Sequence, residues 1–303
     1  MDVRQLRNML AVLEDGSLAK AALRVNLSQP ALTKSIQRLE KQLGVRLFER
    51  DPRGMIPTLY ASGLRNYAQA VCASLLEAEQ QIEALRSGHE GAITIAAPPL
   101  IMTSFVPSAV ARLSQHRPKL QISLVSQTRN LYADLLDGHV GLVVSMLFDE
   151  IPKRGLVKQW LFDDRLVLVM RPDHPLTTLS FVEPKILLNQ KWIFARDGNW
   201  GQSRLRVYFE QHGLDLPRSR IESHDHVVMK SIIMASDHIG LIAKLGVERE
   251  ILTGALACIE IDSPLMGRPI GIVRRENEPT TPATDDLIGF LKDAAKERGR
   301  NSR

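Results

Sequence analysis

The feature of the sequence that most constrains the fold is a change in hydrophobic periodicity near residue 90. Before that point apolar residues recur every three or four positions, which is typical of amphipathic helices. After it, short apolar runs alternate with helical patterns, beginning with Ala92–Ala97. Strands that alternate with helices predict a mostly parallel sheet covered by helices on both faces. We therefore expect an all-α head followed by a larger α/β part.

Charge, like hydrophobic periodicity, differs between the N-terminal part of the chain and the rest. The 303 residues contain 39 Lys and Arg against 34 Asp and Glu, which gives a net charge of +5. Residues 1–65 contain 11 basic and 6 acidic residues, so this segment holds the whole excess. A basic head on a neutral body indicates a polyanionic partner for the head alone.

Three helical patterns precede residue 44, and their ends carry capping residues. Gly16 ends the first pattern, and Asn26 suits a left-handed position in the turn after the short second pattern. Ser28 can cap a third pattern that continues to Leu43, with Pro30 in its first turn. Two short helices joined by a tight turn predict a helix-turn-helix, whose second helix would read DNA.

The outward side of this third helix carries side chains suited to DNA. Gln can pair with adenine, Lys or Arg with guanine, and Thr with a thymine methyl group or a phosphate. An ordinary solvated helix face has the same spacing, so the basic charge of the head is what favours DNA. The residues expected to contact DNA from this helix are Ser28, Gln29, Pro30, Thr33, Lys34 and Arg38.

A β-hairpin is expected directly after the third helix. Leu47 and Phe48 are apolar, residues 51–54 form a turn, and residues 56–59 can pair back as a strand. A hairpin in this place is a wing. Arg50 and Arg53 at its tip are expected to reach phosphates or an adjacent minor groove.

Apolar residues between positions 64 and 85 follow one another in alternating steps of four and three. This is the a/d pattern of a coiled coil, sustained over three heptads. A helix packed on its own domain is the alternative, and the strict 3.5-residue period favours pairing of two chains. The residues of this seam are Leu64, Ala68, Val71, Leu75, Ala78, Ile82 and Leu85.

The segments LSQPALTKSIQRLEKQLGVRLFER and PTLYASGL resemble the signature of LysR-type transcriptional regulators. The match covers about sixty residues, many of which agree at fixed spacing, although Thr33 stands where serine is more usual. The resemblance implies a winged helix-turn-helix, and we interpret its Leu39–Glu40 pair as structural. The residues to which it assigns base or phosphate contacts are Gln29, Pro30, Thr33 and Lys34, with a wing contact for Arg53.

The resemblance also implies the organisation of the whole chain. Residues 1–60 would form the DNA-binding domain and residues 61–88 a coiled-coil dimerisation helix. Residues 89–303 would form an effector-binding domain of two α/β lobes, like type 2 periplasmic-binding proteins. The expected limits of these lobes are about 92–163 with 268–303 for lobe I and about 164–267 for lobe II.

A small-molecule effector is expected between these lobes, because ligands of such sheets lie beyond the carboxyl ends of the strands. In the family a hydroxyl side chain after the second strand commonly touches the effector, and this position falls on Thr128. Residues 98–100 lack the hydroxyls usual after the first strand, which suggests a more apolar or differently anchored effector. The residues expected to line the pocket are Pro99, Leu100, Ser104, Thr128, Met146, Asn199, Trp200, Gln202, His226 and Val227.

Charged and aromatic side chains in the same region bear on the effector's chemistry. Trp200 could stack on a ring, while Arg129, Arg196 and Arg204 could balance an anion. For each of these residues a solvated or structural role is the more frequent one. An anionic or aromatic effector is therefore the working hypothesis.

Other chemistry finds little support in the sequence. There is no GxGxxG after a strand, no GxxxxGK[ST] and no GxSxG motif. The HDH segment at residues 224–226 indicates no third or fourth ligand for a metal, and Cys72 and Cys258 are too few for a disulfide framework. We expect no catalytic residue, no metal and no cofactor.

The expected function is therefore effector-dependent regulation of transcription from operator or promoter DNA in the cytoplasm. No apolar run approaches the ~20 residues that span a bilayer, and a charged N-terminus argues against a signal peptide. A solute-binding protein and an enzyme are the alternatives, against which stand the basic head and the missing catalytic constellation. We expect self-association as a dimer, a tetramer as the resemblance implies, and RNA polymerase as a further candidate partner.

Overall fold

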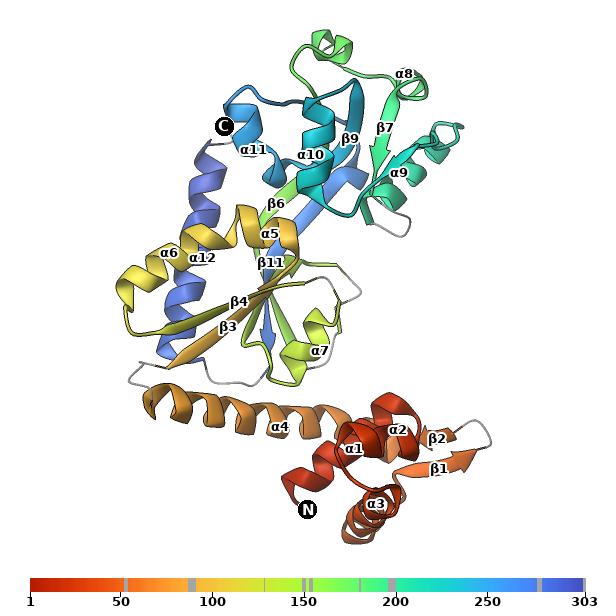
Figure 1. Cartoon of the computed structure of the whole chain (residues 1–303), viewed down its shortest axis with the longest axis vertical. Coiled ribbons are helices and arrows are strands. Elements are labelled where there is room, and N and C mark those ends of the chain that lie inside the picture. Colours follow the sequence, from red (N-terminus) through yellow and green to blue (C-terminus); the bar gives the residue numbers. More distant parts are fainter. Residues whose placement is uncertain are drawn as a thin grey trace.

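The computed structural model describes residues 1–51, 54–86, 91–127, 129–148, 151–152, 155–179, 181–195, 200–276 and 280–301. The chain forms a small helical head, one long helix and a two-lobed α/β domain (Figure 1). None of the helices in the described part of the chain is both long and apolar enough to cross a membrane.

The head begins with three helices whose ends agree with the caps read from the sequence. They are α1 (Val3–Asp15), α2 (Leu18–Arg24) and α3 (Gln29–Leu43). The side chain of Asp2 accepts a hydrogen bond from the backbone N–H of Gln5 and completes a capping box. Ser28 accepts from the N–H of Ala31 at the start of α3. The helices are therefore specified locally before they pack.

The core of the head joins all three helices. Leu32, Ile36 and Leu39 on the inner side of α3 are buried against Met9 and other apolar residues of α1. A side-chain hydrogen bond of 2.8 Å from Asn8 Nδ2 to Ser35 Oγ adds a polar link between α1 and α3. Because the inner face of α3 is fully used, its outer face is left to solvent or a partner.

The wing consists of β1 (Phe48–Asp51) and β2 (Gly54–Pro57), which pair antiparallel. Glu40 Oε1 accepts hydrogen bonds from the backbone N–H groups of Leu47 (2.7 Å) and Phe48 (3.3 Å). This contact confirms the structural interpretation of Glu40, because it ties the wing to α3. On the other side, the N–H of Met55 donates to Gly16 O at 2.8 Å.

Helix α4 (Leu59–Arg86) follows the wing, and its seam residues divide into two groups. Leu64 and Ala68 pack into the core of the head, so the expected coiled-coil seam is wrong for this first part of the helix. Val71, Leu75 and Ile82 are 46%, 38% and 59% exposed. The side chain of Leu85 lies outside the described residues. A 3.5-residue period does not distinguish packing on the chain's own head from packing on a second chain.

The strands of the α/β domain form one sheet with the order β4-β3-β5-β11-β6-β9-β7-β8, in which β10 also pairs with β6. The strands are β3 (Ala92–Ala97), β4 (Gln121–Ser126), β5 (Leu142–Met146), β6 (Leu156–Met170), β7 (Lys191–Phe194), β8 (Ile221–Glu222), β9 (His238–Ala243), β10 (Ala257–Glu260) and β11 (Gly267–Arg275). The helices are α5 (Pro99–Ser104), α6 (Val106–His116), α7 (Leu131–Leu136), α8 (Pro184–Leu187), α9 (Trp200–Gln211), α10 (His226–Met234), α11 (Glu248–Leu252) and α12 (Pro282–Asn301).

The long antiparallel strands β6 and β11 connect two lobes (Figure 1). Lobe I contains β3, β4 and β5, and lobe II contains β7, β8, β9 and β10. The β6–β11 ladder ends at the pair Arg165–Gly267, beyond which β6 pairs with β9 and β10. Pairing is parallel only at the flanks, so the expectation of a mostly parallel sheet is wrong at its centre. The chain passes from lobe I to lobe II along β6 and returns along β11, so these two neighbouring strands must be antiparallel.

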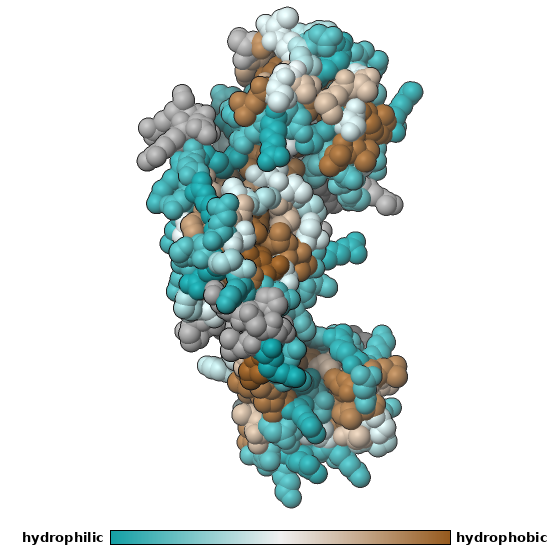
Figure 2. Space-filling model, turned by 60° about the vertical axis from the view of Figure 1, so that its left-hand side comes forward, coloured by the Kyte–Doolittle hydropathy of each residue, from teal (hydrophilic) through white to brown (hydrophobic). Residues whose placement is uncertain are grey.

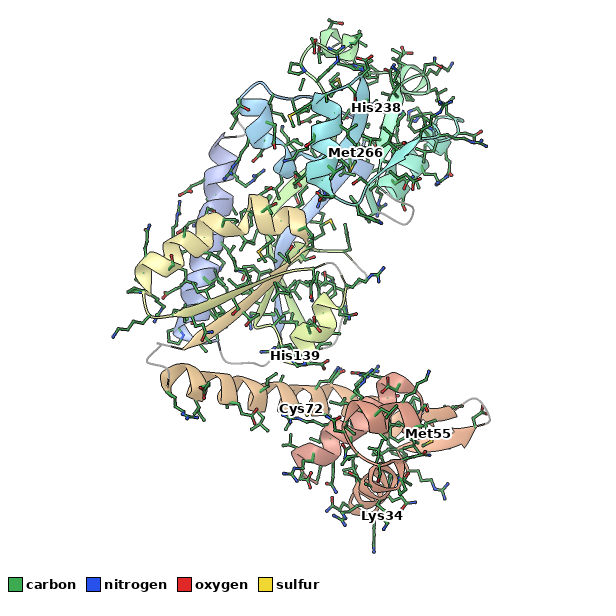
Figure 3. The ribbon with its side chains drawn as sticks, in the orientation of Figure 1. Lys34, Met55, Cys72, His139, His238 and Met266 are labelled. Carbon is green, nitrogen blue, oxygen red and sulfur yellow. The ribbon has the colours of Figure 1, made fainter. Side chains whose placement is uncertain are left out.

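Helix α4 also contacts lobe I. Gly138, just after α7, has a φ of +80°, and a Cβ there would lie 2.6 Å from the Cα of Ala73. Beside it, Gln69 Nε2 donates to Asp137 Oδ1 at 3.3 Å. Figure 3 shows His139 of this loop facing the side of α4 that carries Cys72. The loop at 137–139 therefore rests directly on the linker helix.

The close approach of Gly54 to Gly16 generates a prediction about stability. Gly54 has a φ of +139°, and a Cβ there would lie 2.4 Å from Gly16 O. Gly54→Ala is expected to destabilise the head by about 1–3 kcal/mol and to speed hydrogen exchange of the Met55 amide. Gly63→Ala is the control, because nothing lies within 4 Å of its Cβ and helix propensity favours alanine by about 1 kcal/mol. Equal exchange rates in the two variants would contradict the strained turn.

Candidate nucleic-acid interface and interlobe cleft

The N-terminal half of α3 presents polar side chains away from the core of the head. Ser28, Gln29, Pro30, Lys34 and Arg38 are all exposed. Figure 3 shows Lys34 on the outer side of the head, remote from the α/β domain. The exposed end of α3 is thus free to enter a groove of DNA without first breaking its packing on the head.

Thr33 differs from these residues because it is half-buried. Its hydroxyl donates a hydrogen bond to Gln29 O at 2.9 Å, within the helix itself. Its methyl group and an acceptor lone pair are what remain for a partner. A thymine methyl group or a base donor would fit this position better than a phosphate.

Part of the unpaired positive charge of the described head lies on α3. Arg24 on α2 forms ion pairs with Glu14 and Asp15, so its charge is already balanced. Lys34 and Arg38 form no ion pair among the described residues. An unbalanced cation near a phosphate gains more than a paired one, because no existing contact is lost.

A groove of about 910 Å³ separates α3 from the wing. Lys41 and Arg46 on its walls are basic residues that the sequence analysis did not name, although both belong to the basic excess of the head. The side chain of Arg50 and the whole of Arg53 lie outside the described residues, so their expected contacts remain predictions.

A cavity of about 370 Å³ lies between the two lobes. From lobe I it is lined by residues of α5, and from lobe II by the start of α10 and nearby residues. Five residues expected from the sequence meet here: Pro99, Leu100, Ser104, His226 and Val227. The further lining residues are Thr103, His224, Asp225, Lys230 and Gly246.

The two lobes touch at one side of this cavity. A Cβ on Gly246 of lobe II would lie 2.3 Å from Leu100 Cδ1 of lobe I, so the contact depends on glycine. Sequence reasoning gave no signal for Gly246, because the contact joins residues that are far apart in the chain.

Two charged residues that line the cavity, Asp225 and Lys230, have local partners. Asp225 accepts from the backbone N–H of Val227 at 2.7 Å and so caps α10. Lys230 Nζ donates to Gly246 O at 3.1 Å and forms an ion pair with Glu250. Burial, followed by the nearby charge of Arg268, lowers the pKa of His226, so this side chain is neutral near pH 7.

The other described residues that were expected to contact the effector do not line this cavity. Met146 at the end of β5 contacts Arg268 Nε through its sulfur at 3.3 Å. Trp200 stacks on Phe148 of lobe I with ring centroids 4.7 Å apart, and the side chain of Arg204 lies over its ring. Gln202 Oε1 is buried without a hydrogen-bond partner among the described residues. Thr128, Asn199 and Arg196 lie outside the described residues.

The described residues contain no group of three or more His, Cys, Asp and Glu placed to hold a metal ion. Burial is the main factor that raises the pKa of both Cys72 and Cys258. Raised thiol pKa values disfavour the thiolate needed for nucleophilic chemistry.

Two family models match the chain. "Bacterial regulatory helix-turn-helix protein, lysR family" covers residues 3–62, and "LysR substrate binding domain" covers residues 86–296. Together they account for the head and nearly all of the α/β domain.

Similar proteins extend the match over the whole length. The transcriptional regulator GbpR of Azospirillum brasilense is 26% identical over 100% of this chain and 89% of its own. The regulator CbbR of Xanthobacter flavus is 28% identical over 96% and 87%. The fold is similar to a full-length OxyR variant from Pseudomonas aeruginosa (TM-score 0.60, 19% identity, covering 96% and 98%). It is also similar to CbnR complexed with its target DNA (TM-score 0.56, 20% identity, covering 97% and 100%).

The exposed start of α3 generates a prediction about base preference. Gln29→Ala should cost about 1–3 kcal/mol of discrimination at one base pair of the bound site, because a bidentate amide contact is lost. The measurement is competition binding against sites that differ by single base pairs. Gln42→Ala is the matched control, since Gln42 is exposed in the last turn of the same helix. Unchanged preference in Gln29→Ala would show that α3 meets DNA in another register.

Proposed function

Because this chain belongs to the LysR family of DNA-binding transcriptional regulators, we propose how its head, linker helix and two-lobed domain share the work. The head reads operator DNA, and α4 pairs the heads of two chains. An effector bound between the lobes changes the relative positions of the two heads. The single observation that carries this proposal is the exposed, unpaired face at the start of α3 in the described part of the head.

The proposed domain limits are those expected from the sequence. Residues 1–60 form the DNA-binding domain, residues 61–88 the dimerisation helix and residues 89–303 the effector-binding domain. Within the last, residues 92–163 and 268–303 form lobe I and residues 164–267 form lobe II. The end of the β6–β11 ladder at Arg165–Gly267 supports this division of the lobes.

In the proposed DNA complex the start of α3 lies in the major groove. Gln29 and Lys34 contact base edges, Arg38 contacts the backbone, and Ser28 with the first turn of α3 approaches a phosphate. Arg50 and Arg53 of the wing reach the flanking phosphates or minor groove. The division between base and phosphate contacts gives both specificity and affinity.

The proposed dimer contact is the exposed side of α4. Val71 lies at one seam position of the heptad, and Leu75 and Ile82, seven residues apart, lie at the other; all three are exposed. Hydrophobic side chains are visible on the surface of this part of the molecule (Figure 2). Ala73, which contacts the loop after α7, lies on the opposite side of the helix. The chain therefore covers one side of α4 itself and leaves the other for a second copy.

Further parts of the proposal follow from family membership. Two dimers would associate into a tetramer, and the regulator would act on the cytoplasmic chromosome, with RNA polymerase as a further partner. The chain would have no enzymatic activity, since its family consists of regulators. The effector would act by shifting the populations of open and closed lobes.

Binding to the DNA upstream of its own gene tests the proposed function. A gel-shift experiment should show a sequence-specific complex at low salt. If each dimer neutralises about 8 phosphates, log K should fall against log salt with a slope of about −7. No specific shift, or a response that does not depend on salt, would contradict DNA binding by the head.

The exposed seam of α4 generates a separate prediction about assembly. Leu75→Glu should weaken dimerisation, because two carboxylates would face each other across the paired helices. Sedimentation velocity at micromolar concentration should show a shift toward monomer, and operator affinity should fall with it. Ala70→Glu is the control, because Ala70 is exposed outside the a and d positions of α4 and gains the same charge. Identical sedimentation of the two variants would place the dimer contact elsewhere.

A further inference from the structure

Arg268 occupies a buried position at the junction of the two lobes. It lies on β11 beside the end of the β6–β11 ladder, and its side chain is only 9% exposed. Its Nε atom contacts the sulfur of Met146, which ends a strand of lobe I. It also lies near enough to His226, at the start of α10 in lobe II, to help lower the pKa of that side chain. The guanidinium therefore sits between groups from both lobes. Its ion-pair partner Asp164 accepts from the N–H of Leu245, and the next residue, Gly246, lines the 370 Å³ cavity.

The hydrogen-bonding capacity of Arg268 is largely unused within the described part of the chain. A thioether sulfur is a weak acceptor, so the contact with Met146 satisfies little of the Nε–H group. The nearest carboxylate oxygen, Asp164 Oδ2, is 3.5 Å from Nη1, which is too long for a hydrogen bond. Asp164 is itself 1% exposed, and its Oδ2 has no hydrogen-bond partner among the described residues. The open donors of Arg268 keep some exposure, so a ligand or a water molecule can accept from them.

Asp164 balances the charge of Arg268 without completing its hydrogen bonds. The Oδ1 atom of Asp164 accepts from the backbone N–H of Leu245 at 3.1 Å, which holds the carboxylate in place. Burial raises the pKa of Asp164, so its ionised form is less stable than that of an exposed aspartate. The guanidinium keeps its charge even when buried.

The other positive groups of the cavity are already occupied. Lys230 is paired with Glu250 and Gly246, and the N-terminus of α10 is capped by the carboxylate of Asp225. His226 is neutral near pH 7 because burial lowers its pKa. Among the described residues that line or adjoin the cavity, Arg268 is thus the cation with open donors.

We propose that the effector is a small carboxylic acid whose carboxylate is held by Arg268 at the floor of the interlobe cleft. This inference rests on the proposed function, because it names the chemical class of the ligand for that cleft. The planar guanidinium offers two parallel N–H groups, which match the two oxygens of a carboxylate. The apolar side chains of Pro99, Leu100 and Val227 would cover the body of the acid.

The position of Arg268 also gives the acid a way to act on the lobes. One bound carboxylate would contact a side chain that already touches Met146 of lobe I and approaches His226 of lobe II. Satisfying the donors of Arg268 would favour the lobe arrangement in which all three groups converge. The acid would therefore stabilise one lobe arrangement over the other.

The test compares acids with their neutral amides on the full-length protein. The probes are benzoate and benzamide, salicylate and salicylamide, and butanoate and butanamide, followed by thermal shift and calorimetry. At least one acid should raise the Tm by several degrees, while its amide should bind about 10- to 100-fold more weakly. A panel in which no acid raises the Tm, or in which the amides bind as tightly as the acids, would overturn the proposal.

The variant for this test removes the charge without leaving a lone buried carboxylate. Arg268→Gln combined with Asp164→Asn replaces both partners, and the amide oxygen introduced at position 164 can still accept from the N–H of Leu245. This pair should abolish the response to the acid while operator binding without effector is retained. Arg171→Gln is the control, since Arg171 pairs with Asp173 and Asp237 beyond the lobe II end of β6, away from the junction of the lobes. An acid response that persists in the double variant would assign the anchor to another residue.

The two proposals fail in different ways. Specific operator binding together with a response to neutral compounds would contradict the role of Arg268 alone. Loss of specific DNA binding in the unaltered protein would contradict the proposed function, whatever the lobes bind.

Discussion

The structure depends on a single helix that packs on two sides at once. Near its start, Ala61 and Ala68 of α4 are buried in the core of the head. Farther along, Ala73 lies against Gly138 of lobe I, where only glycine allows such a close approach. Between these contacts, the side that carries Ala61 and Ala68 continues with Val71 and Leu75, which are exposed in the described part of the chain. One rigid helix thus contacts the head and lobe I and also carries the exposed seam. A shift of α4 at any one of these places therefore moves the other two.

The contact between α4 and lobe I is small and partly polar, so the two can change their relative position at low cost in free energy. Gln69 and Asp137 share one hydrogen bond of 3.3 Å. Burial, and then the charge of Glu14 on α1, raises the pKa of Asp137, so head, linker helix and lobe I meet at this carboxylate. A joint held by one hydrogen bond and a glycine contact contributes about 1 kcal/mol or a little more. An effector that favours one lobe arrangement can therefore change the contact between α4 and lobe I without unfolding the helix or the lobe.

Local signals predicted the head well, and contacts between distant segments were the part that could not be foreseen. Ser28 caps α3 and the helix ends at Leu43, both as expected, and Glu40 holds the wing as its structural interpretation required. The burial of Ala68 could not be predicted, because its heptad position suits a partner chain equally well. In the cleft, Lys230 and Arg268 carry no local motif, and only the return of β11 beside β6 brings Arg268 to the junction of the lobes.

The central claim is that α4 pairs two heads so that two copies of α3 read two half-sites. Hydroxyl-radical footprinting of the full-length protein on its operator tests this claim most directly. The account predicts two protected tracts related by two-fold symmetry, with centres separated by about one helical turn of DNA or a multiple of it. A single protected tract, or two tracts in direct repeat, would contradict it.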